Sequence, residues 1–312
     1  MRKGEKIYIS GHTGLLGSAL LKTLRQKGYT NIATKTHQEL DLRDSRLVSA
    51  FFSKERPKYV FHAAARVGSI TDNIKHPANF ITDNILIQTN IIHEAYKNKV
   101  KKLISFGSNC AYPRLAPQPM KEEFLLTGPI EPTNEAYGMA KVAGMIMSQS
   151  YNKQYGTDFI SLIPASLYGP NDHFTGDRAH IIPRLIKKFH DAKIKKELSI
   201  VIRDNPKKYR EYLFVDDLAE ACVYFMLKDK SKNREKSIIN IGTGDGISLR
   251  HLSFLIRDSI GYKGKIIWAD NVPAGMPKKI LNPKYAHRLG WRSKTDLATG
   301  IKTTYKWYLG QK

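Results

Sequence analysis

The fold is decided near the N-terminus by the stretch Ile7-Tyr8-Ile9-Ser10-Gly11-His12-Thr13-Gly14-Leu15-Leu16-Gly17. Its first four residues predict a short buried strand, and the leucines after the turn recur at helical spacing as far as Lys27. The three glycines remove a Cβ where a chain must turn, approach a pyrophosphate and pack a helix on a strand. The stretch therefore predicts the first strand–turn–helix unit of a dinucleotide-binding domain, with the helix N-terminus facing the phosphates.

Strand and helix continue to alternate as far as residue 164. We expect further strands at 31–34, 59–63, 103–106 and 159–163, and helices at 44–54, 80–98 and 134–155. Later helices are expected at 180–192, 215–227 and 249–259, among short strands and loops. This order predicts an α/β protein with a Rossmann-type doubly wound parallel sheet. We predict a cofactor-binding domain at 1–164 and a smaller substrate-binding lobe at 165–312, some of whose segments return to the first sheet.

The composition is that of a soluble globular protein, since 41% of the 312 residues are hydrophobic and 25% are charged. No apolar run approaches the roughly 20 residues of a membrane helix. The apolar segment near the N-terminus is too short for a signal peptide. Two distant cysteines, Cys110 and Cys222, predict no disulfide framework. We therefore expect a cytoplasmic protein without membrane association or a metal site.

The formal net charge of +23 raises the question of nucleic-acid binding. However, lysines and arginines are scattered along the whole chain, without a basic tail or an RNA-binding motif. Anionic small ligands explain the charge more simply, because two diphosphate-bearing substrates in one cleft would profit from positive steering. We predict no nucleic-acid partner.

A second group of residues predicts chemistry at the carboxyl ends of the strands. Ser108 follows a predicted strand, while Tyr137 and Lys141 lie on one face of the next helix. Tyr137 would protonate the oxyanion that forms when a nicotinamide delivers hydride to a carbonyl, and Ser108 would hydrogen-bond the carbonyl oxygen. Lys141 would lower the phenol pKa and hold the nicotinamide ribose. The group predicts a reductase, although a Tyr-x-x-x-Lys pair alone is also common on surfaces.

The choice of cofactor depends on the end of the second strand, which reads Thr34-Lys35-Thr36-His37. NAD sites usually place an acid there for the ribose hydroxyls. No acid occurs before Glu39. Lys35 and His37 suit a 2′-phosphate, so NADP(H) is predicted, with the alternative that Lys35 points into solvent.

Longer segments resemble the extended short-chain dehydrogenase/reductases, and within that group the GDP-L-fucose synthase family. The resemblance covers nearly the whole chain and includes Gly107-Ser108-Asn109-Cys110-Ala111-Tyr112-Pro113, Leu167-Tyr168-Gly169-Pro170, His180-Ile181-Ile182-Pro183 and Arg210-Glu211-Tyr212-Leu213. That family epimerises a GDP-4-keto-6-deoxymannose at C3 and C5 and reduces C4 with NADPH. The resemblance implies that Cys110 and His180 are the acid and base of epimerisation. It also implies a GDP-linked 4-keto-deoxy sugar as substrate and a homodimer formed through a helix pair.

The motifs and the resemblance together imply two sets of binding residues. Around NADP(H), besides Tyr137 and Lys141, we expect Gly11, Thr13, Gly14, Leu15, Leu16, Gly17, Lys35, His37, Asp41, Leu42, Ala63, Ala64, Ala65, Pro164, Leu167 and His180. Around the GDP-sugar we expect Ser108, Asn109, Cys110, Lys188, Arg203, Arg210 and Lys278.

The chain departs from the family's pattern in the loop at residues 203–209. Arg203 and Asp204 stand where the family has a Trp and a Gly against the sugar and diphosphate, and Thr13 and His37 stand where it has cofactor arginines. These changes favour a different sugar, either a 6-deoxy-4-keto-heptose or another modified hexose. Three alternatives therefore stay open: a C4-reductase without epimerase activity, an NAD-dependent nucleotide-sugar 4-epimerase, and a non-catalytic NADP-binding regulator.

Overall fold

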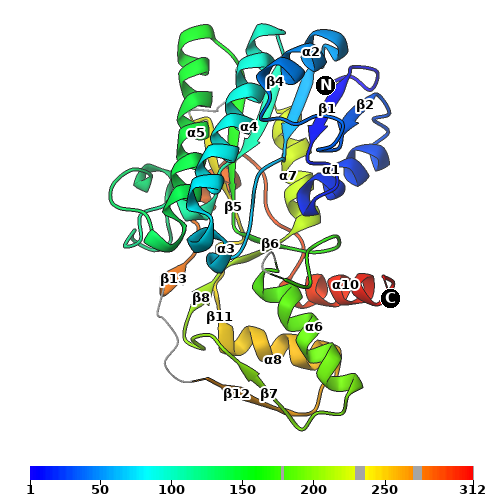
Figure 1. Ribbon diagram of the computed structural model, residues 1–312, viewed down its shortest axis with the longest axis vertical. Coiled ribbons are helices and arrows are strands. Elements are labelled where there is room, and N and C mark those ends of the chain that lie inside the picture. Colours follow the sequence, from blue (N-terminus) through cyan, green and yellow to red (C-terminus); the bar gives the residue numbers. More distant parts are fainter. Residues whose placement is uncertain (177–178, 229–235, 270–275, 312) are drawn as a thin grey trace.

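The computed structural model describes residues 1–176, 179–228, 236–269 and 276–311 (Figure 1). Its centre is a six-stranded sheet with the strand order β10-β5-β4-β3-β1-β2, in which every neighbouring pair is parallel. The strands are β1 (Ile7–Ser10), β2 (Ile32–Lys35), β3 (Tyr59–His62), β4 (Lys102–Phe106), β5 (Phe159–Pro164) and β10 (Ile238–Ile241). The predicted α/β fold with a doubly wound parallel sheet is confirmed.

Helices cover both faces of this sheet (Figure 1). One face carries α2 (Ser45–Glu55), α4 (Pro77–Lys97) and α5 (Glu135–Tyr155), and the other carries α1 (Leu15–Gln26) and α7 (Val215–Leu227). Along β1, Ile7 and Ile9 belong to the core under α1 and α7, whereas Tyr8 packs against Phe51 and Phe52 of α2. A strand buried on both faces must be apolar at successive positions, which is why Ile7, Tyr8 and Ile9 form a continuous apolar run.

The smaller lobe lies at one end of the sheet, in the lower half of Figure 1. It contains β6 (Ser166–Tyr168), α6 (Ile181–Ile194), β7 (Ser199–Ile202), β8 (Tyr209–Arg210), β9 (Tyr212–Phe214), β11 (Ile247–Ser248), α8 (Leu249–Ile260), β12 (Lys265–Trp268), β13 (Lys278–Lys279) and α10 (Leu297–Leu309). Its strands form the small sheets β11-β8-β13, β12-β7 and β6-β9. Apolar residues of α6 and α8, among them Leu185, Phe189 and Ile256, form its own core.

Two segments of the C-terminal half return to the large sheet, namely α7 and β10. The buried Asn240 of β10 donates a side-chain hydrogen bond to the Met120 carbonyl (2.9 Å) and accepts one from the Tyr112 hydroxyl (2.7 Å). These bonds tie β10 to the loop that follows Cys110, so the C-terminal half helps to hold that loop in place. The domain boundary at residue 164 stays a prediction.

The remaining short helices lie in connections. They are α3 (Ile70–Lys75), η1 (Asn109–Ala111), η2 (Glu122–Phe124), η3 (Pro132–Asn134) and α9 (Lys284–Arg288). Within the described ranges, no helix is both long enough and apolar enough to cross a bilayer.

Candidate active site

The glycine turn between β1 and α1 is closed by backbone contacts that leave no room for a side chain. Gly11 has a φ of +71°, and a Cβ there would lie 2.8 Å from the backbone of Ala64. A Cβ on Gly17 would lie 2.0 Å from the Gly11 carbonyl oxygen. Glycine is therefore required at both positions, one for the turn and the other for the close packing of α1.

The turn also presents hydrogen-bond donors that fit a dinucleotide. Gly14 caps α1 without a side-chain hydrogen bond, so amide groups of the first turn remain available to an anion. His12 has a buried Nδ1 atom without a partner among the described residues. The cradle and these polar groups fit the pyrophosphate of a dinucleotide.

At the end of β2, Lys35 lies beside a carboxylate. Its Nζ atom is 3.1 Å from Glu39, which also accepts a hydrogen bond from the Thr36 amide (2.8 Å). The hydrogen bonds from Thr36 and Lys35 lower the pKa of Glu39 to about 2. His37 lies 3.9 Å from Asp41. The end of β2 has no acidic residue of its own, but the Glu39 carboxylate, four residues after Lys35, lies beside it. The side chains at this strand end therefore carry both positive and negative charges.

The catalytic candidates meet where β4 and α5 approach each other. Ser108 caps η1, and its Oγ atom accepts a hydrogen bond from the Cys110 amide (3.1 Å). Tyr137, in the first turn of α5, is hydrogen-bonded to the Ser108 side chain. A Cβ on Gly138 would lie 2.8 Å from the Cys110 carbonyl oxygen, so the glycine after Tyr137 lets α5 approach η1 this closely. The structure therefore brings Ser108, Cys110 and Tyr137 together.

Lys141 is buried one turn further along α5, with its Nζ atom 5.8 Å from the centre of the Tyr137 ring. Burial lowers the pKa of Lys141 to about 8. Burial and the negative charge of a Cys110 thiolate raise the pKa of Tyr137, although the bond with Ser108 lowers it. Tyr137 is therefore protonated at neutral pH and able to donate a proton.

His62 is a buried neighbour of this centre. Its Nδ1 atom is hydrogen-bonded to the Ser10 hydroxyl group (2.8 Å). Burial, together with the positive charge of Lys141, lowers the pKa of His62 to about 3. Its ring is therefore neutral and adds no charge beside the ammonium group.

Two cations approach Cys110 from the smaller lobe. The Nζ atom of Lys279 lies 3.4 Å from the Cys110 Sγ atom. In the pairing of β13 with β8, Lys279 stands opposite Arg210, whose guanidinium donates to the carbonyls of Tyr209 (2.7 Å) and Met276 (2.8 Å). The substrate-binding residues predicted from the sequence include Arg210 and Lys278. The structure places Lys279 beside Cys110 instead, whereas Lys278 is exposed. Alternation along β13 allows only one of the two lysines to face the site.

The remaining predicted substrate residues lie on α6 and the loop after β7. His180 caps the N-terminus of α6, and Lys188 lies eight residues further along that helix. Lys188 donates a hydrogen bond to the Val201 carbonyl of β7, and Arg203 directly follows that strand. Partial burial lowers the pKa of Lys188, and the positive charges of Arg184 and Arg203 lower it further. Lys188 and Arg203 are therefore close neighbours, and together with Arg184 they form a group of positive charges.

The other predicted residues occupy strand ends or nearby segments. Ala63, Ala64 and Ala65 follow β3, Pro164 ends β5, Leu167 lies in β6, and Asn109 is the first residue of η1. Carboxyl ends of parallel strands share one edge of the sheet, which is where such folds bind ligands. Thr13, Leu15 and Leu16 belong to the glycine turn and the start of α1, and the buried Leu42 packs under α2.

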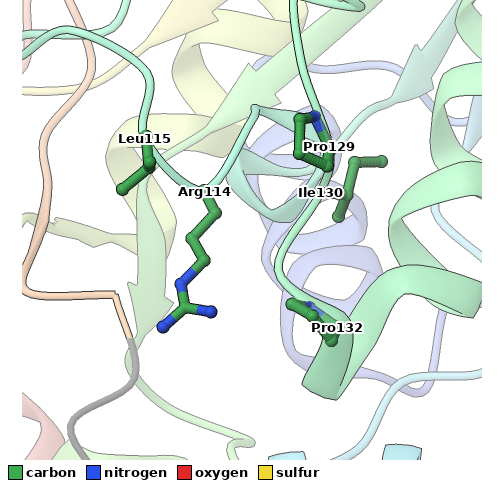
Figure 2. Close-up of a pocket in the computed structure, with 5 residues that line it drawn as sticks. All are labelled: Arg114, Leu115, Pro129, Ile130 and Pro132. Carbon is green, nitrogen blue, oxygen red and sulfur yellow. The ribbon is translucent and has the colours of Figure 1, made fainter.

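A pocket of about 410 Å³ lies beside this centre and contains none of the predicted residues (Figure 2). Its lining residues are Arg114, Leu115, Pro129, Ile130 and Pro132. Arg114 donates its amide to the Pro129 carbonyl (2.9 Å) and pairs with Glu131 (3.3 Å). Ile130 lies against Gly138, which follows Tyr137. The pocket is mainly apolar and borders the first turn of α5.

Comparison with known proteins agrees with this geometry. The family model described as the NAD dependent epimerase/dehydratase family matches residues 7–242. The chain belongs to this family of dinucleotide-dependent enzymes. The prediction of an oxidoreductase with the extended short-chain dehydrogenase/reductase fold is confirmed.

More specific relatives assign the chain to the GDP-L-fucose synthase family within that class. It is 45% identical to the GDP-L-fucose synthase 1 of Arabidopsis thaliana, over 98% of this chain and 94% of that protein. It is 42% identical to the GDP-L-fucose synthase of Escherichia coli K12, over 98% and 97% of the two chains. Two solved structures from Campylobacter jejuni are also similar over 99% or more of both chains. A GDP-6-OMe-4-keto-L-xylo-heptose reductase has 35% identity and a TM-score of 0.94, and a GDP-mannoheptose C4 reductase with NADP bound has 36% and 0.91.

Replacement of Tyr137 by phenylalanine should reduce NADPH-dependent ketone reduction about 10²- to 10⁴-fold, because the phenol beside Ser108 is the predicted proton donor. The rate constant of NADPH oxidation in a single-turnover experiment measures the chemical step. Tyr151→Phe, about four turns further along the same helix, is a matched control and should stay near wild type. Tyr137→Phe activity above roughly a tenth of wild type would contradict the assignment.

The pH dependence of reduction should report the buried Lys141. Its ammonium supports the negative charge left on Tyr137, so kcat/KM should be level below about pH 7 and fall above pH 8, where Lys141 loses its proton. In Lys141→Arg the side chain stays charged at all these pH values, and the decline near pH 8 should disappear even if the rate is lower. A decline at the same pH in both proteins would assign it to another group.

Proposed function

We propose that this protein reduces the C4 keto group of a GDP-linked 4-keto-6-deoxy sugar, a hexose or a heptose, with NADPH. The observation that carries the proposal is the assembly of Ser108, Tyr137 and buried Lys141 at the carboxyl edge of a dinucleotide-binding sheet. The GDP-L-fucose synthases and the GDP-heptose reductases among its relatives support the substrate class.

In this mechanism each residue of the centre has one task. Bound NADPH supplies the hydride that reduces C4. Ser108 donates a hydrogen bond to the C4 oxygen, and Tyr137 gives that oxygen its proton. Lys141 stabilises the phenolate that remains. The glycine turn and the N-terminus of α1 hold the pyrophosphate, and Lys35 binds the adenosine end.

The same pocket can also invert the carbons beside the ketone. A keto group at C4 acidifies the protons at C3 and C5, so a base on one side and an acid on the other suffice for inversion. Cys110 and His180 supply these groups from the two lobes. The Nζ atom of Lys279 lies 3.4 Å from the Cys110 sulfur and places a hydrogen-bond donor beside this group.

Cations of the smaller lobe bind the GDP diphosphate. Arg210, Lys188 and Arg203 lie on β8, α6 and the loop after β7, and each carries a donor suited to phosphate oxygens. Arg203 and the Asp204–Lys208 ion pair (2.7 Å) occupy the loop in which this chain departs from the family pattern. We therefore assign the choice of sugar to this loop.

The proposed reaction is tested by NADPH oxidation with GDP-4-keto-6-deoxymannose and with a GDP-4-keto-6-deoxy-heptose. We expect oxidation with at least one of them, and none with either would overturn the proposal. Incubation of the same ketones in D₂O without NADPH separates the two reactions. Deuterium at C3 and C5 that is lost in Cys110→Ser and His180→Asn, but kept in Tyr137→Phe, supports epimerisation. Reduction without any incorporation identifies a C4-reductase that retains Cys110 and His180 only as pocket walls.

We also propose that the protein is a homodimer joined through α4 and α5, and that it acts in the cytoplasm. The two helices lie side by side (Figure 1). Each exposes apolar residues, Ile85 and Leu86 on α4 and Met139 and Ile146 on α5, which are between 36% and 41% exposed. Both cysteines are free thiols, which supports a reducing compartment.

Replacement of Ile146 by glutamate should convert the dimer to a monomer, because the interface would have to bury an unpaired carboxylate. Light scattering after gel filtration measures the mass. Leu198→Glu, at an exposed apolar position of the other lobe, is the control and should remain dimeric. A monomeric wild type, or a dimeric Ile146→Glu, would contradict the proposed interface.

A further inference from the structure

One stripe of α6 connects the proposed acid–base residue to the proposed diphosphate site. His180, Arg184 and Lys188 are four residues apart and therefore lie above one another on the same side of the helix. The charge of Arg184 acts on both of its neighbours, since it lowers the pKa of His180 and that of Lys188. Arg184 thus lies between these two residues in space as well as in sequence.

Arg203 completes a group of three cations. Lys188 reaches across to the Val201 carbonyl, which fixes α6 against the end of β7, and the charge of Arg203 also lowers the pKa of Lys188. Among the described residues, none of Arg184, Lys188 and Arg203 has a carboxylate within salt-bridge distance. Lys187, the neighbour of Lys188 on the same helix, is instead paired with Asp191. Glu197 acts on Lys188 in the opposite sense, but from beyond salt-bridge distance. Cations that repel one another without a salt-bridged acid suit an anionic ligand.

We propose that Arg184, which neither motif nor resemblance singled out, binds the diphosphate of the GDP-sugar between Lys188 and His180. The inference rests on the proposed function and extends it. A diphosphate has oxygens on both phosphorus atoms, and a guanidinium group can bind two of them at once. From the middle of the stripe, Arg184 holds the phosphate nearest the sugar and thereby fixes the sugar in front of His180.

This position also affects the protonation of His180. In the described part of the chain, the charged or titratable groups that act on the His180 ring are His173, from the loop before α6, and Arg184. Loss of solvent around the ring lowers the pKa of His180, and electrostatic interactions with His173 and Arg184 lower it further. Removal of the Arg184 charge must therefore raise the pKa of His180.

The test compares Arg184→Ala with Lys187→Ala in the NADP-saturated enzyme, with GDP as the probe. Alanine is a good helix former, so the exposed position 184 and the half-buried position 187 both tolerate the change. In calorimetric titrations we expect Arg184→Ala to weaken GDP binding about tenfold, the usual order for a lost charge-assisted phosphate contact, whereas Lys187→Ala binds like wild type. In NMR titrations of the histidine rings, with His180 assigned through His180→Asn, the pKa of His180 should rise in Arg184→Ala, because one of the positive charges that lower it is removed. Arg184→Lys, which retains the charge, should largely restore the wild-type pKa.

Equal GDP affinity in Arg184→Ala and Lys187→Ala would overturn the phosphate contact. An unchanged His180 titration in Arg184→Ala would overturn the placement of the guanidinium between the two neighbours. Failure of the proposed function looks different: wild type would then bind GDP and NADPH yet reduce neither 4-keto sugar, while the differences between the variants in GDP binding would persist.

Discussion

The candidate site depends on one backbone contact, in which the carbonyl of Cys110 occupies the space that a Cβ of residue 138 would need. This contact sets the distance between η1, at the end of β4, and the first turn of α5. Ser108 and Tyr137 can share a hydrogen bond only because the two elements approach this closely. Any larger residue at 138 would separate them, and the phenol and hydroxyl would no longer act on the same oxygen.

Electrostatics then determine what the closely packed site can bind. Burial lowers the pKa of Lys141, and the positive charges of Arg184 and Arg203 contribute to the lowered pKa of Lys188. An anionic ligand beside these cations would relieve their mutual repulsion. The net charge of +23 therefore need not indicate nucleic acid, because local groups of unpaired cations suit small anionic ligands.

The sequence predicts the fold, and the grouping of Ser108, Tyr137 and Lys141, because both depend on local patterns. Apolar runs predict the buried strands, the glycine spacing predicts the turn, and a four-residue interval places Tyr137 and Lys141 on one helix face. What the sequence does not predict depends on contacts between distant segments. Lys278 and Lys279 are the same type of residue, so the sequence alone does not distinguish them. Only the pairing of β13 with β8 shows which one reaches Cys110.

The same reason explains two further gaps. The Glu39 carboxylate lies beyond the position where an acid is expected, yet the turn after β2 brings it back to Lys35. Strand β10 reads as one more short apolar segment, and only its pairing with β5 makes it the edge of the large sheet.

The proposed site residues come from two parts of the chain with separate apolar cores. Ser108, Tyr137 and Lys141 all come from the first 164 residues and are held by the large sheet and its helices. His180, Lys188, Arg203 and Arg210 come from the smaller lobe, whose core is a separate cluster of apolar side chains. Changes in the loop after β7 can therefore alter the contacts to sugar and diphosphate while the phenol, the ammonium group and the serine keep their positions. A family built in this way can exchange one 4-keto sugar for another, or lose inversion at C3 and C5, without rebuilding its reducing centre.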